Sequence, residues 1–257
     1  MSGPELPPLW RDLEFLAPMS SSRADDLARW VADGLTDGGT VLDVGCGWAE
    51  LLLRVLEAAP RAVGAGVDLD ADRVEEGRRR AAARGLADRT RLLAGPGAEA
   101  VEGPVEALLV VGASQVWGPD VDEGLPLDHA AALGAMRRQV VTGARVVHAE
   151  AVWSVPPTAA ATARLSGRDD EFLAPAALAD LVAAHGFEVH AQEEADLAEW
   201  DAFEAGFTAR WDRWLADHPA DHPDAAAVSA AAAGQRAAYH QGYRGVLGFT
   251  FLRLVAV

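Results

Sequence analysis

The chain has 257 residues, half of them hydrophobic, and a net charge of −17 at pH 7. This length supports one substantial core with an appendage and is too short for two large domains. The negative charge would repel a phosphate backbone or an anionic lipid surface, so nucleic acid and membranes are poor candidate partners. The single cysteine, Cys46, cannot form a disulfide within the chain, and no stretch approaches the roughly 18 apolar residues of a membrane span. We therefore expect a cytoplasmic protein with a small-molecule ligand.

The N-terminal segment is expected to form a helical unit over residues 9–35, in which Ser22 and Asp25 have the spacing of a capping box. From residue 40 onward, short apolar runs alternate with amphipathic segments, a pattern typical of βαβ units. The predicted strands are residues 40–44, 62–69, 90–94, 107–112, 144–152, a segment after Gly186, and 248–257. The predicted helices are residues 50–60, 71–86, a segment ending near Gly186, 199–219 and 225–238.

These elements predict an α/β fold with a doubly wound, mostly parallel, seven-stranded sheet and helices on both faces. We divide the chain into an N-terminal helical lid (residues 1–39), an α/β core (40–190), a helical cover for the substrate inserted before the last strand (191–245), and the closing strand of the core (246–257). The helical tract from residue 199 carries tryptophans at helical spacing, which favours a core or a homodimer interface over a substrate pocket.

The most informative segment is VLDVGCGWAE, residues 41–50, in which a strand meets two glycines and then opens a helix. Gly45 and Gly47 allow a tight turn and a close approach of the backbone to a ligand, a feature that dinucleotide sites share. Asp43 stands just before these glycines, where it would repel a pyrophosphate and attract a cation. Asp68 ends the next strand about 20 residues further on, where an acid can accept both ribose hydroxyls of either ligand class.

Together the two segments resemble motifs I and II of the class I, Rossmann-like methyltransferases that use S-adenosylmethionine, a ligand with an ammonium, a sulfonium and no phosphate. The resemblance implies that Asp43 and the glycines hold the methionine moiety, that Asp68 holds the ribose, and that Leu69 lies against the adenine. The full set of cofactor-binding residues it implies is Asp43, Gly45, Cys46, Gly47, Asp68, Leu69, Gly97, Ala98 and Gly112.

The chain departs from the family pattern at two places. Ala49 stands where many members have a third glycine, and the bulky Trp48 lies inside the turn. Pro96 occupies the position of an aspartate that contacts the adenine amino group, so the backbone of Gly97 and Ala98 or the side chain of Glu99 would replace that contact.

The reacting groups are expected beyond the carboxyl ends of the fourth and fifth strands. There AEAVW, residues 149–153, resembles a Gly-Glu-Pro-Tyr-Trp segment of a bacterial family of small-molecule methyltransferases. Glu150 is the first candidate for a general base, with His148 and His240 behind it, although Glu150 could equally pair with an arginine or bind an amine. The candidate substrate contacts are Trp117, Trp153, Tyr239 and Tyr243. No metal site is expected, because the chain has no HxxxH or CxxC motif.

The sequence thus predicts transfer of a methyl group from S-adenosylmethionine to an oxygen or nitrogen of a small molecule, by in-line displacement with positioning and, where a proton must leave, base assistance. Two alternatives stay open. The protein could bind S-adenosylmethionine as a sensor or scaffold without turnover, or it could be a nicotinamide-dependent oxidoreductase, against which the acid before the glycines argues. The acceptor, the atom methylated and the pathway are left open.

Overall fold

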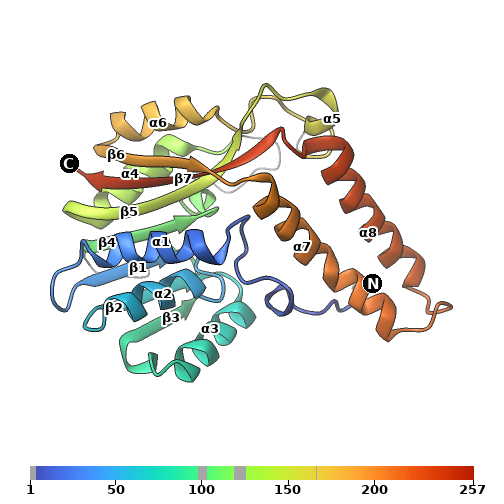
Figure 1. Ribbon diagram of the computed structural model, residues 1–257, viewed down its shortest axis with the longest axis horizontal. Coiled ribbons are helices and arrows are strands. Elements are labelled where there is room, and N and C mark those ends of the chain that lie inside the picture. The colour runs from blue at the N-terminus through green and yellow to red at the C-terminus, as the bar shows by residue number, and fades with distance from the viewer. Residues whose placement is uncertain (1–3, 98–102, 119–125, 166) are drawn as a thin grey trace.

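The computed structural model describes residues 4–97, 103–118, 126–165 and 167–257. Within these residues seven strands form one sheet in the order β3-β2-β1-β4-β5-β7-β6 (Figure 1). Strands β1 to β5 pair in parallel, and β7 runs antiparallel to both β5 and β6. The strands are β1 Thr40–Val44, β2 Val63–Asp68, β3 Thr90–Ala94, β4 Val105–Val111, β5 Val140–Trp153, β6 Phe187–Glu194 and β7 Leu247–Ala256.

Helices cover both faces of this sheet (Figure 1). One face carries α1 to α3, whose buried side chains join one core cluster, and the other carries α4 and α6, which join a second. This arrangement confirms the predicted doubly wound α/β fold. The helices are α1 Ser21–Ala32, α2 Glu50–Ala58, α3 Ala71–Ala83, α4 His129–Gln139, α5 Ala159–Thr162, α6 Pro175–Ala184, α7 Leu197–Asp217 and α8 Ala225–Ala238, with 3₁₀ turns η1 Leu9–Arg11, η2 Ala87–Arg89 and η4 Ser114–Trp117 and a π-helical turn η5 Tyr239–Tyr243.

The first long helix begins two residues earlier than the predicted capping box implies. Its N-cap is Ser20, whose side chain accepts the backbone N–H of Arg23, so the prediction that Ser22 caps the helix is wrong. Ser20 also donates its backbone N–H and its hydroxyl to Glu199 at the start of α7, at 2.9 and 2.7 Å. The four buried residues of α1 pack within the main core, where Leu27 and Val31 each contribute about 1.5–3 kcal/mol. Helix α1 is therefore part of the core.

Helices α7 and α8 pack against each other and extend beyond the carboxyl end of the sheet (Figure 1). A complete capping box starts α7, because the Asp196 side chain accepts the N–H of Glu199 and the Glu199 side chain accepts the N–H of Asp196. Trp211 and Trp214 are buried between α7 and α8 and pack with Val228 in a separate cluster. Trp200, near the start of α7, packs instead in the main core cluster, so the tryptophans of this tract serve cores. No helix in the described part of the chain combines the length and apolar character that crossing a bilayer requires.

Candidate functional site

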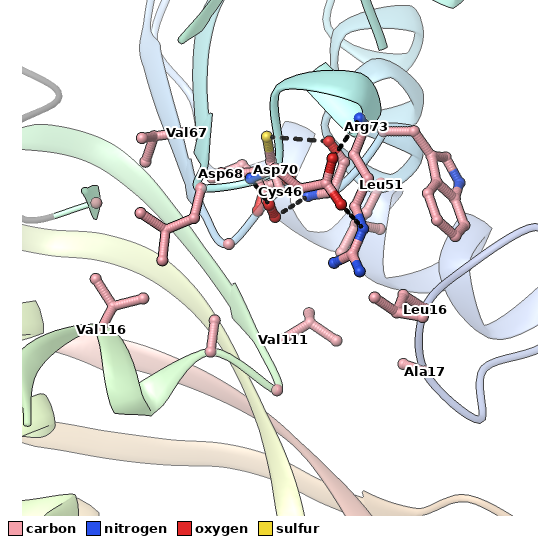
Figure 2. Close-up of a pocket in the computed structure, with 18 of the residues that line it drawn as sticks. Leu16, Ala17, Cys46, Leu51, Val67, Asp68, Asp70, Arg73, Val111 and Val116 are labelled. Carbon is pink, nitrogen blue, oxygen red and sulfur yellow. Dashed lines mark hydrogen bonds and ion pairs between the residues drawn. The ribbon is translucent and has the colours of Figure 1, made fainter. Parts of the chain in front are cut away.

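A cavity of about 430 Å³ lies at the carboxyl ends of β1, β2 and β4 (Figure 2). Ligands of open α/β sheets bind at this edge, and small-molecule sites have volumes of about 300–1,000 Å³. Five segments form the wall: the glycine turn after β1, the end of β2 with the start of α3, the turn after β3, the turn after β4, and residues 15–19 of the N-terminal segment. The predicted glycine turn and the strand-end acid are therefore brought together around one cavity.

The glycine turn is held by backbone geometry. Gly45 and Gly47 have φ values of +72° and +54°, and a Cβ at Gly45 would collide with the Cβ of Ala113 from the turn after β4. The backbone N–H groups of Gly45 and Cys46 both donate to the carbonyl of Val67, at 2.9 and 3.0 Å. The turn is thereby fixed to the end of β2, with its backbone bordering the cavity.

Ala49 occupies the position of the family's third glycine and keeps a left-handed backbone, with φ +59°. This conformation costs an L-residue about 1–2 kcal/mol. The methyl group of Ala49 is fully buried, so packing offsets part of that cost. The turn therefore retains the shape that a glycine would favour.

Asp68 shapes the turn and borders the cavity (Figure 2). One carboxylate oxygen accepts the backbone N–H of Gly47 at 2.8 Å, and the other accepts the N–H of Asp70 at 2.9 Å. A carboxylate offers about four acceptor sites, so both oxygens can still accept hydroxyl groups of a ligand. The Asp68 carboxylate can therefore hold the glycine turn and, at the same time, accept hydrogen bonds from a diol in the cavity.

Asp43 is 5 % exposed and forms part of the cavity wall. Burial raises its pKa to about 8, and the negative charge of Asp68 adds to the effect. No arginine of the described residues offsets this charge. A buried carboxyl of this kind favours a ligand that brings a positive charge. Burial also raises the pKa of the neighbouring Cys46 thiol, which argues against a nucleophilic role for Cys46.

The other predicted cofactor residues in the described chain also border the cavity. Leu69 is 76 % exposed at its rim, which leaves the side chain free to cover a flat ligand. Gly97 lies where a Cβ would crowd Val116, and Gly112 ends β4. Ala98 and Glu99 lie outside the described residues.

The two predicted catalytic residues do not border the cavity. Glu150 is 6 % exposed on the face of β5 that packs toward α4, and its carboxyl accepts the N–H of Ala151 at 3.1 Å. Burial raises the pKa of Glu150, and it lowers the pKa of His148 to about 3, with repulsion from His129 adding to that effect. A general base must lie within hydrogen-bond reach of the proton that it takes, and neither Glu150 nor His148 lines the cavity, which argues against the predicted base role of both residues.

The aromatic residues predicted to contact the substrate also lie away from the cavity. Trp153 is buried and donates its indole N–H to the carbonyl of Asp169 at 2.8 Å. Tyr239 and Tyr243 are buried at the base of the helical pair, where their hydroxyls donate to acids of α7 at 2.7 and 2.6 Å. Trp117 is half-buried against the second core cluster, and His240 borders a separate pocket between α7 and α8. For Trp153, Tyr239 and Tyr243, the partner that fixes the side chain is distant in sequence and cannot be recognised from a local pattern.

Several residues of the cavity wall were not predicted as site residues. They include Leu16, Ala17, Trp48, Arg73, Gln115 and Val116. Phe15 and Met19, which also line it, belong to the N-terminal unit that was expected to act as a lid. Arg73 follows the strand-end acid by five residues and pairs with Asp70 at 3.0 Å. Of these residues, Trp48 could have been recognised from the sequence, because a bulky side chain within a glycine turn is unusual.

No protein-family model matches this chain, and no curated protein sequence does. Solved structures match along nearly its whole length. A methyltransferase of Geobacter sulfurreducens described as SAM-dependent, in complex with S-adenosyl-L-homocysteine, has a TM-score of 0.82 and 23 % identity, covering 97 % of this chain and 96 % of its own. A counterpart from Thiobacillus denitrificans, in complex with the same molecule, has a TM-score of 0.80 and 25 % identity, covering 98 % and 99 %.

A third match is YjhP from Escherichia coli, with a TM-score of 0.79, 23 % identity and 95 % coverage of both chains. All three match the fold of this chain at low sequence identity. The chain therefore has the Rossmann-like α/β fold of methyltransferases.

Proposed function

We propose that this protein is an S-adenosylmethionine-dependent methyltransferase that acts on a small molecule. The observation that carries the proposal is the pair of acids, Asp43 and Asp68, on either side of a glycine turn in a cavity of small-molecule size. A dinucleotide would bring its pyrophosphate against this negative charge, whereas S-adenosylmethionine brings an ammonium and a sulfonium. The complexes of the Geobacter and Thiobacillus proteins with S-adenosylhomocysteine support the same ligand class.

The residues present fit this cofactor. Asp68 would accept the ribose hydroxyls while holding the turn, and Asp43 would lose its proton and pair with the ammonium, whose positive charge would stabilise the buried carboxylate. Gly45 and Gly47 leave the backbone free to approach the methionine moiety, because side chains there would meet Ala113 or need a strained conformation. Leu69 would cover the adenine from the rim.

When bound, the cofactor supplies an electrophilic methyl group on its sulfonium. The protein's task is to hold donor and acceptor about 3–3.5 Å apart and in line, and to keep water out. If the two acids hold the ammonium and the ribose, residues 15–19 together with Val111 and Gly112 would form the wall around the methyl group. We infer that residues 15–19 act as the lid and that the α7–α8 pair covers the acceptor.

Turnover tests this proposal. The protein is incubated with S-adenosylmethionine labelled at the methyl group and with the small-molecule fraction of a bacterial extract, and S-adenosylhomocysteine and labelled product are measured. The Asp68→Asn variant, which keeps the side-chain shape and loses the charge, is the control and should show little transfer. Binding without transfer from any fraction would favour the sensor or scaffold alternative, and binding of NAD in place of S-adenosylmethionine would contradict the proposal.

A further inference from the structure

Trp48 lies inside the glycine turn and reaches from it to the N-terminal segment. The side chain is 2 % exposed and borders the cavity. Its indole N–H donates to the backbone carbonyl of Glu14 at 2.7 Å. Glu14 directly precedes the residues 15–19 that form one wall of the cavity. One residue of the turn therefore touches both the ligand space and the segment that closes it.

The position of the Trp48 ring is fixed by further contacts. The ring of Trp10 packs edge-on at 6.3 Å between centroids, and the guanidinium of Arg80 lies 5.7 Å from the centre of the Trp48 ring. The left-handed backbone on both sides, at Gly47 and Ala49, sets the direction in which the side chain leaves the turn. A shift of the turn would therefore displace the indole, and with it the bond to Glu14.

A second set of contacts joins the same two regions. Glu50, buried just after the turn, pairs with Arg54 at 3.1 Å and with Arg80 at 3.0 Å. Arg54 also forms an ion pair with Glu14, and Arg80 donates to the carbonyl of Trp10 at 3.3 Å. The start of α2 and the N-terminal segment are thus joined by one direct bond from Trp48 and by two arginines anchored on Glu50.

We propose that Trp48 is a positioning residue that couples donor binding to the placement of residues 14–19 over the cavity. The inference rests on the proposed function, because the donor is the ligand that would contact the backbone of the turn. Donor contact fixes the turn, the turn fixes the indole, and the indole N–H holds Glu14. Donor binding would thereby stabilise the wall that residues 14–19 form, which would exclude water before the acceptor enters.

The test compares Trp48→Phe with Trp153→Phe. Both variants keep an aromatic ring and lose one indole N–H bond to a backbone carbonyl, at 2.7 and 2.8 Å, but Trp153 lies away from the cavity. S-adenosylhomocysteine is titrated by calorimetry, and amide hydrogen exchange is measured with and without it. Trp48→Phe should bind about two- to tenfold more weakly, the effect of one neutral hydrogen bond. Ligand-induced protection of residues 14–19 should shrink in Trp48→Phe and stay at the parent level in Trp153→Phe.

A tryptophan with a purely structural role would lower the melting temperature in both variants and leave ligand-induced protection unchanged, which would overturn the proposal. If Trp48→Phe does not fold, hydrogen exchange of the Trp48 indole N–H in the parent protein decides, because this group donates to the Glu14 carbonyl. Slower exchange of the indole N–H in the presence of S-adenosylhomocysteine supports the coupling, and unchanged exchange refutes it. If the parent protein does not bind S-adenosylhomocysteine, the proposed function fails first and this inference fails with it.

Discussion

The pKa of Asp43 predicts a pH dependence of ligand binding that one substitution should abolish. In the free protein burial raises this pKa to about 8, with repulsion from Asp68 adding to it. Binding of an ammonium needs the ionised carboxylate, so the protein must release a proton when the ligand binds below pH 8. Affinity for S-adenosylhomocysteine should therefore rise with pH toward 8 in the parent protein and stay nearly flat in Asp43→Asn.

The expected size follows from the ionised fraction of Asp43. With a pKa of about 8, roughly 1 % of the free protein is ionised at pH 6, about 9 % at pH 7 and about 24 % at pH 7.5. Affinity should thus increase about twentyfold between pH 6 and pH 7.5. Titration calorimetry at pH 7 in buffers of different ionisation enthalpy should show release of about 0.9 proton per ligand. The Asp43→Asn variant should bind more weakly and release almost none.

The result that would refute this reasoning is a parent affinity that does not change between pH 6 and pH 7.5, with no proton released. Asp43 would then be ionised in the free protein already, or it would not face the ligand. A fall in affinity with rising pH would contradict the sign of the argument.

Four further predictions concern stability and the rest of the site. The pKa of Asp43 is higher in the folded protein than in the unfolded chain, so ionisation of Asp43 destabilises the fold as the pH rises from about 4 to about 8. At pH 8 and without ligand, Asp43→Asn should therefore raise the melting temperature and increase the free energy of unfolding by an amount on the order of a few kcal/mol. Asp68→Ala should weaken binding of S-adenosylmethionine and S-adenosylhomocysteine about ten- to a hundredfold, and a thermal melt should show a loss of stability because two backbone amides lose their acceptor. Gly45→Ala should abolish detectable binding in calorimetry, since its Cβ meets Ala113. Glu150→Gln should keep ligand affinity and, once an acceptor is known, keep turnover within about threefold, whereas a loss of about 10²–10⁴-fold would restore the base role.

Much of the fold could be predicted because its strands and helices follow local periodicity. The apolar runs at residues 40–44 and 90–94 coincide with β1 and β3. The start of β5 at Val140 was missed, because its first residues, VVTG, form no apolar run and are recruited by pairing with Val105. The cap at Ser20 was missed for a similar reason, since Glu199 selects it from 179 residues away.

The donor side of the site was predictable because one strand–turn–helix segment and one strand end carry it. Asp43, the two glycines and Asp68 are positioned by β1 and β2, whose register follows from the parallel sheet. The residues that would contact the methyl acceptor could not be predicted in the same way. Strand alternation indicates that His148 and Glu150 lie on one face of their strand, but it does not indicate which face meets the cavity. Tyr239 and Tyr243 were misjudged because Asp201 and Glu204, on another helix, bind their hydroxyls.

We propose that the cavity beside Asp43 and Asp68 binds S-adenosylmethionine and its product. Titration calorimetry of the purified protein with S-adenosylhomocysteine and, in parallel, with NAD at pH 7.5 tests this binding. We expect saturable binding of one S-adenosylhomocysteine per chain and no binding of NAD. Saturable binding of NAD, or no binding of S-adenosylhomocysteine by a protein whose thermal melt shows that it is folded, would contradict it.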